Sequence, residues 1–157
     1  MSSELFEYGL SLSARLDRKF GKKTIAAKMT DVPGHTKAII PFLKNAGIEF
    51  LHLGVNPASA VPDVPEIFRW QCDTGESINV IYNGEYGDFT ILGDTGVALY
   101  FAHTNDNLGG QTPEEVEETF AALREKVPGA ELVAADLNDV AYVLREIEST
   151  LPVVTDE

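Results

Sequence analysis

The feature that most constrains the fold is a strand, turn, helix and strand pattern within residues 24–53. Residues 24–29 and 48–53 are short apolar runs, as is typical of buried strands. Between them lie a Pro-Gly turn at residues 31–35 and an apolar helical stripe formed by Ala38, Ile39, Phe42 and Leu43. This order within about thirty residues predicts a βαβ unit, in which the strands are parallel and the crossover is right-handed.

Two more apolar runs and a hairpin pattern extend this unit along the chain. Residues 97–102 and 131–135 have the apolar character of buried strands. Residues 67–72 and 77–82 are separated by Asp-Thr-Gly-Glu, which predicts a β-hairpin. We therefore predict a single α/β domain over residues 1–157 with three layers. Its mostly parallel sheet contains strands 24–29, 48–53, 97–102 and 131–135, and the hairpin is inserted near residues 67–82.

Helix signals flank these strands. Leu5, Tyr8, Leu12 and Leu16 recur at helical spacing before Gly21, which predicts an amphipathic helix over residues 3–19. The sequence Thr-Pro-Glu-Glu at residues 112–115 combines a threonine N-cap, a proline at the first helical position and a capping box. It predicts a helix that ends near residue 127. We expect a glycine-rich surface loop at residues 83–96 and a final helix at residues 138–150. Another strand is expected to begin at residues 151–154.

Composition narrows the range of partners and compartments. With 25 acidic and 12 basic residues, the formal charge is −13, so we expect neither nucleic acid nor an anionic membrane surface as a partner. The single Cys72 cannot form an internal disulfide or a thiolate metal cluster, and we expect it to be a buried strand thiol. The sequence contains neither a signal-peptide pattern nor an apolar run of about 18 residues, so we expect a cytoplasmic location.

Polar side chains follow three of the predicted strands. Asp31 and His35 follow the first, Asn56 follows the second, and His103 and Asp106 follow the third. Ligands of parallel α/β folds bind beyond the carboxyl ends of the strands, so these residues are expected on one face. A carboxylate and an imidazole around a Pro-Gly turn can bind a divalent metal, or the imidazole can orient the carboxylate.

Each of these residues also has a structural interpretation. Asp31 could cap the helix that follows its turn, as aspartates at strand-to-helix turns commonly do. His52, inside an apolar strand, could be a hydrogen-bonded core histidine. Asp106 could belong to a turn in which short polar side chains bond their own backbone. The acidic run at residues 114–118 is expected to be a solvated helix face rather than a metal site.

The turn after the first strand resembles a segment of a known enzyme family. Residues 30–36, Thr-Asp-Val-Pro-Gly-His-Thr, are similar to the Ile-Asp-Pro-Phe-Gly-His-Ser segment of glycoside hydrolase family 38. These are retaining, zinc-dependent α-mannosidases, and the resemblance is greatest to an uncharacterised bacterial branch. It implies that Asp31 is the nucleophile that forms the glycosyl-enzyme intermediate and also a zinc ligand. It implies that His35 supports this turn, and we assign both residues as metal ligands.

The resemblance continues over roughly residues 24–147. Residues 47–54 are similar to an aromatic strand of the family that ends in glycine, and residues 103–107 lie where the family has Gly-Ser-Asp-Phe or Gly-Asp-Asp-Phe. Asp106 is thereby the acid/base candidate, and we assign His103 and Asn56 to substrate binding. The family fold implies that this chain is part of a (β/α) barrel of the glycoside hydrolase/deacetylase type.

The chain departs from the family pattern at several positions. Val55 replaces a substrate-contacting arginine and Asn107 a phenylalanine, so mannose specificity does not carry over. The family's upstream His-x-Asp zinc pair and its downstream histidine ligand are not among these residues. We therefore expect a fragment of a catalytic barrel that binds no zinc tightly and has no α-mannosidase turnover alone.

Three functional hypotheses follow. The first is an α-mannosidase-like glycoside hydrolase fragment with a carbohydrate partner. The second is a non-catalytic carbohydrate-binding or structural α/β module. The third is a metal-dependent polysaccharide deacetylase-like hydrolase, against which the lack of an Asp-Asp pair and of a His-x-x-x-His stretch counts. Because a partial barrel leaves strand edges and apolar faces uncovered, we also expect a homo-oligomer.

Overall fold

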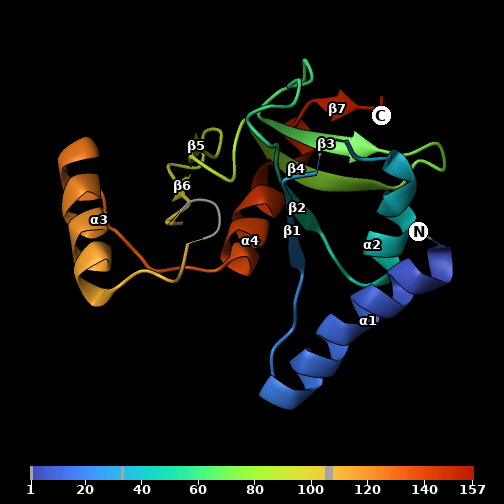
Figure 1. The fold of residues 1–157 in the computed structure, drawn as a ribbon. Helices are drawn as coiled ribbons and strands as arrows, with labels where there is room; N and C mark the ends of the chain where they lie inside the picture. Colours follow the sequence, from blue (N-terminus) through green and yellow to red (C-terminus); the bar gives the residue numbers. More distant parts are fainter. Residues whose placement is uncertain (1, 33, 105–107) are drawn as a thin grey trace.

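A mostly parallel five-stranded sheet forms the centre of the protein (Figure 1). The computed structural model describes residues 2–32, 34–104 and 108–157. The strand order is β1-β2-β4-β3-β7, in which β3 runs antiparallel to β4 and the other neighbours are parallel. These strands are β1 (Ala26–Thr30), β2 (Phe50–Gly54), β3 (Ile67–Gln71), β4 (Ser77–Asn83) and β7 (Val153–Val154).

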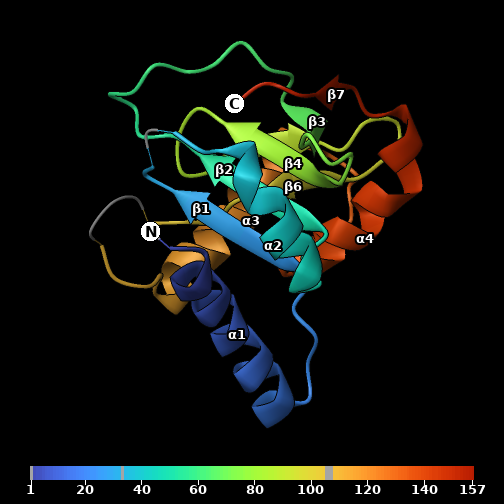
Figure 2. The same ribbon diagram turned by 90° about the vertical axis from the view of Figure 1, so that its right-hand side faces the viewer.

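Helices cover both faces of this sheet, which gives three layers (Figures 1 and 2). The helix α1 (Ser3–Phe20) and the pair η1 (Lys37–Ile39) and α2 (Ile40–Asn45) lie on one face. The helix α4 (Leu137–Ile147), followed by η2 (Glu148–Thr150), lies on the other. The predicted mixed α/β fold with a mostly parallel sheet is therefore confirmed. None of the helices in the described ranges is both long and apolar enough to cross a membrane.

The strand β2 shows why the sequence forms this core. All five of its residues are buried, as expected for a central parallel strand whose two faces are both covered. Leu51 and Leu53 pack in the cluster that includes Leu43 of α2, whereas Phe50 packs in the opposite cluster with Leu144 of α4. The alternation of side chains along one strand thus joins two hydrophobic clusters through a single sheet.

The prediction is wrong for two strands of the main sheet. In place of the predicted strand 97–102, residues Ala98–Tyr100 form β6, which pairs antiparallel with β5 (Phe89–Ile91) in a separate two-stranded sheet. Residues 131–135 form no strand. The main sheet instead contains β4, which is parallel to β2. Whether a short apolar run joins the main sheet depends on tertiary partners that local sequence does not specify.

The predicted hairpin pairing is present, because β3 and β4 are antiparallel from Ile67↔Ile81 to Gln71↔Ser77. The residues at 151–154, whose partner could not be assigned from sequence, contribute β7 alongside β3. The remaining helix, α3 (Pro113–Lys126), begins with the predicted capping box but has no buried residue. Figure 1 shows α3 standing apart from the sheet and its covering helices.

Candidate functional site

Asp31 lies in a left-handed backbone conformation directly after β1. Its φ is 63°, and among the described residues it is the one non-glycine residue with a positive φ. Its backbone N–H donates to the carbonyl of Gly54 at 3.0 Å, which ties the turn to the end of β2. This conformation costs an L-residue roughly 1–2 kcal/mol, so the surrounding contacts must hold it in place. The strain is located at the predicted site.

Two donors from neighbouring loops orient the Asp31 carboxylate. The Asn56 Nδ2 donates to Asp31 Oδ1 at 2.6 Å, and the Tyr86 hydroxyl donates to the same oxygen at 3.4 Å. The Asn56 Oδ1 accepts from the backbone N–H of Ala58 at 2.8 Å, and this contact fixes which end of the amide faces Asp31. Residues after β1, β2 and β4 thus meet at one carboxyl edge, as the sequence predicted for Asp31 and Asn56.

The alternative role of Asp31 as a helix cap is wrong. The N-cap of η1 is Thr36, whose hydroxyl accepts from the backbone N–H of Ala38 at 3.3 Å. The Asp31 carboxylate is exposed and bonded to Asn56 and Tyr86 instead. The Asp31 carboxylate therefore does not cap η1.

His103 joins the same edge through Tyr86. The two rings are in edge-to-face contact with centroids 6.2 Å apart, and His103 Nε2 lies 3.1 Å from the Gly87 carbonyl oxygen. His103 also lines a groove of about 800 Å³ between α3 and the segment before it. Its polar lining includes Thr104, Gln111, Glu115, Glu118 and Thr119. Tyr86, which fell in a predicted surface loop, is a contact residue that sequence reasoning missed.

Within the described residues, no contact brings His35 to Asp31. His35 is partly buried between β1 and η1, and burial lowers the pKa of its imidazole. Asp106 lies outside the described residues, so the Asp31–Asp106 carboxyl pair stays a prediction. Within the ranges 2–32, 34–104 and 108–157, no three His, Cys, Asp or Glu side chains are grouped closely enough to hold a metal ion.

A polar network lies behind this edge, on the sheet face that α4 covers. The ring of His52 is fully buried between Lys28 Nζ, 2.7 Å from Nδ1, and Asn83 Oδ1, 2.8 Å from Nε2. The amide nitrogen of Asn83 donates to Glu66 and Thr90, at 3.3 and 3.2 Å. Because the Asn83 oxygen faces the ring, Nε2 carries the proton and Nδ1 accepts from Lys28. The interpretation of His52 as a hydrogen-bonded core histidine agrees with this geometry.

The ammonium of Lys28 connects this network to the Asp31 edge. It donates to the backbone carbonyl of Tyr86 and lies 4.4 Å from the centre of the Phe101 ring. Although much of Lys28 is exposed, burial of its amine end lowers its pKa to about 8. Burial, with a smaller contribution from the Lys28 charge, lowers the pKa of His52 to about 4. Lys28 thus positions the loop whose tyrosine contacts Asp31.

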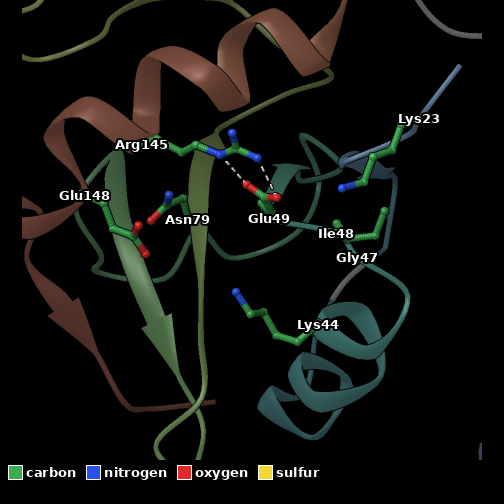
Figure 3. A pocket seen from close by; sticks show the side chains of 8 residues that line it. All are labelled: Lys23, Lys44, Gly47, Ile48, Glu49, Asn79, Arg145 and Glu148. Atoms are coloured by element: carbon green, nitrogen blue, oxygen red, sulfur yellow. Dashed lines mark hydrogen bonds and ion pairs between the residues drawn. The ribbon is translucent and has the colours of Figure 1, made fainter.

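A separate cavity of about 200 Å³ lies at the opposite, amino-terminal end of the sheet (Figure 3). Figure 3 shows the ammonium groups of Lys23 and Lys44 on two sides of the Glu49 carboxylate. Arg145 donates two hydrogen bonds to Glu49, of 2.5 and 2.6 Å, which lower the pKa of that carboxyl. The Arg145–Glu49 ion pair at this cavity therefore joins α4 to the residue directly before β2.

Comparisons with known proteins add no further assignment. No family model matches the chain, and neither does any curated protein or solved structure. The similarity of residues 30–36 to the mannosidase segment therefore stays a resemblance.

Proposed function

We propose that the chain is the middle portion of a glycoside hydrolase-like catalytic domain and that Asp31 is its nucleophilic carboxylate. The observation that carries this proposal is the strained Asp31 turn, whose carboxylate is oriented by Asn56 and Tyr86. Strained backbone of this kind is concentrated at functional sites. The partial (β/α) barrel belongs to the same proposal, with β1, β2 and β4, which are adjacent in the sheet, as parallel barrel strands.

The hydrogen bonds to Asp31 leave one of its carboxylate oxygens available for nucleophilic attack. Both donors bond Oδ1, and within the described part of the chain Oδ2 accepts no hydrogen bond. In a retaining reaction, Oδ2 would form a bond to the anomeric carbon while the bond from that carbon to the leaving oxygen breaks. A second carboxyl group about 5–5.5 Å away would give its proton to the leaving oxygen, and we propose Asp106 for this role. Water then releases the sugar from Asp31 and returns the proton to the second carboxyl.

The groove lined by His103 provides space for the rest of a carbohydrate. Its volume of about 800 Å³ lies within the usual range for ligand sites. Hydroxyl, amide and carboxylate side chains line it, and these groups exchange hydrogen bonds readily with sugar hydroxyls. We propose that His103 and Asn56 contact substrate, His103 in the groove and Asn56 beside Asp31.

The donors in this chain do not fit a zinc ion. Structural and catalytic zinc sites have three or four protein ligands, whereas Asp31 and His35 supply two and are joined by no contact in the described residues. No step of the proposed chemistry is therefore assigned to a metal. The zinc of the related family would require ligands that these residues do not provide, and the deacetylase-like alternative requires such ligands as well.

A second candidate function is a non-catalytic carbohydrate-binding module. It is favoured by the same deficit of metal ligands, because sugar binding through Asn56, His103 and the groove needs no metal. The two candidates share a binding site and differ in whether Asp31 reacts. Turnover therefore separates them, once binding has been established.

Binding of sugars to the isolated chain tests both candidates. We expect mannose or a short mannoside to perturb backbone amide signals near Asp31, Asn56 and His103 in a saturable NMR titration, and Asp31→Asn to weaken binding at least several-fold. The control Asp94→Asn, in an exposed turn, should leave binding unchanged. We expect no hydrolysis of an aryl α-mannoside by this chain alone.

Three results would change this assignment. The absence of saturable shifts with mono- and oligosaccharides would remove both candidates. Binding that Asp31→Asn leaves intact would favour the module, and turnover lost in Asp31→Asn would show that the chain alone is catalytic.

A further inference from the structure

The helix α1 presents an exposed stripe of large apolar side chains. Leu5, Tyr8, Leu12, Leu16 and Phe20 are 59%, 59%, 40%, 56% and 64% exposed. Their spacing of three or four residues places them on one face of the helix. The sequence predicted the helix, but this stripe is not the face that packs on the core. A contiguous apolar face of this kind marks an interaction surface in a protein that is otherwise strongly acidic.

The neighbouring face of α1 already has its partner within the chain. Phe6 and Leu10 pack against the main core cluster, and the rings of Phe6 and Phe42 meet edge to face with centroids 5.9 Å apart. Figures 1 and 2 both show the C-terminal end of α1 extending away from the sheet. Phe6 and Leu10 thus hold α1 against the core, and the stripe remains exposed for contact with another molecule.

We propose that this stripe binds the α1 stripe of a second copy of the chain, with the two helices antiparallel. The spacing is nearly self-complementary about Leu12: in an antiparallel pair, Leu12 faces Leu12 of the second copy, Tyr8 faces Leu16, and Leu5 lies one residue from the position that faces Phe20. A two-fold axis requires one surface patch to match itself in this way. The inference concerns a surface distinct from the proposed sugar site and is independent of it.

The charges along α1 favour the antiparallel orientation. Glu4 and Glu7 lie in its first half, whereas Arg15, Arg18 and Lys19 lie in its second. Antiparallel pairing brings the acidic half of each helix to the basic half of the other, whereas a parallel pair would place like charges together. With Asp17 included, α1 carries three acidic and three basic side chains, so two copies meet there without the repulsion that the net charge of −13 creates elsewhere.

The strength expected of this contact follows from its size. At 18 residues, α1 is about 27 Å long, and one helix pair of this length forms an interface at the small end of specific contacts. We therefore expect a reversible dimer whose population rises with protein concentration. Sedimentation velocity over a concentration series measures this directly.

A charge placed at the two-fold axis tests the interface. In Leu12→Arg two like charges face each other in the dimer, so we expect at least a tenfold weaker association. The control Val133→Arg replaces a side chain that is 70% exposed in a coil far along the chain from α1, and it should leave the dimer unchanged. Circular dichroism and thermal melting of both variants report whether the fold is intact. A monomer at high micromolar wild-type concentration, or a dimer insensitive to Leu12→Arg, would overturn the proposal.

Cysteine cross-linking tests the orientation without a charge change. Because Leu5 lies next to Phe20 of the other copy, a mixture of Leu5→Cys and Phe20→Cys proteins should oxidise to a mixed disulfide dimer. Leu5→Cys alone should cross-link far less, and the wild-type chain, whose Cys72 is buried, provides the background. Efficient cross-linking of Leu5→Cys to itself would indicate a parallel pair and refute the antiparallel assignment. Binding of the monomer to lipid vesicles through the stripe, with no dimer, would also refute it.

Discussion

The five-stranded sheet and the segment from residue 84 to residue 136 are stabilised in different ways. Every residue of β2 is buried, whereas the buried positions in the described part of the segment are Gly87, Thr90 and Leu92. The sheet is held by apolar burial on both faces. The segment is held by a short antiparallel pair, polar contacts to the sheet and the local capping of α3. The proposed site lies where the two regions meet, since Tyr86 and His103 belong to the segment and Asp31 follows the sheet.

The largest predicted difference between the regions is in the cost of truncating a leucine. Leu51→Ala, at a fully buried position in β2, should lower the free energy of unfolding by about 3–4 kcal/mol because it leaves a cavity between packed layers. Leu123→Ala, at a half-exposed position of α3, should cost less than about 1 kcal/mol. Urea denaturation followed by circular dichroism measures both. Equal losses would mean that α3 is part of the same cooperative core.

The second prediction concerns pH and the network that joins the regions through Asn83 and Thr90. The pKa of His52 is about 4 in the folded chain and near 6.5 when unfolded, so between these values the unfolded chain binds more protons. Stability from neutral His52 is therefore complete above about pH 6.5 and falls as the pH drops toward 4. We expect a loss of about 2 kcal/mol between about pH 7.5 and pH 5.

The variant His52→Gln separates this contribution from that of other groups. Glutamine does not titrate, so the slope of stability between pH 7.5 and pH 5 should become shallower, even if the variant is less stable throughout. An unchanged slope would assign the pH dependence to other residues. Denaturant melts across this pH range supply the measurement.

The third prediction concerns the close approach of the two regions at Gly54. A Cβ added there would collide with the carbonyl of Glu85 and with the methyl group of Thr30, whereas a Cβ on Gly84 would meet no atom within 4 Å. Gly54→Ala should therefore cost about 2 kcal/mol through displaced backbone, and Gly84→Ala less than about 1 kcal/mol. Since Gly54 also accepts from the Asp31 N–H, NMR should show shifted Asp31 and Tyr86 signals in Gly54→Ala alone. Equal costs would argue against tight contact between the regions.

The same contrast explains how much could be predicted from the sequence. Residues of β1 and β2 were predicted because continuous apolar runs and the Pro-Gly turn determine them locally, and Asp31 and Asn56 followed from the rule for strand ends. The place of β4 in the sheet was not predicted, because hairpin patterning does not reveal which strand a hairpin joins. Tyr86 and Lys28 were missed as contact residues for a related reason. One lies in a glycine-rich loop and the other in an apolar run, and their roles arise only from tertiary contacts.

The smallest predicted effect is confined to α3. The Thr112 hydroxyl accepts from the Glu115 N–H at 3.2 Å, and the Glu115 carboxylate accepts from the Thr112 N–H at 2.8 Å. Thr112→Ala removes one half of this capping box, which is worth about 1 kcal/mol of helix stability. Because α3 buries none of its residues, we expect that loss as faster amide hydrogen exchange within α3, with the global unfolding midpoint nearly unchanged. The matched change in the core helix, Asp136→Ala, removes the corresponding cap of α4, which packs against the sheet through Val140 and Leu144. There the same local cost should lower the global midpoint, and equal global effects of the two variants would show that α3 unfolds together with the sheet.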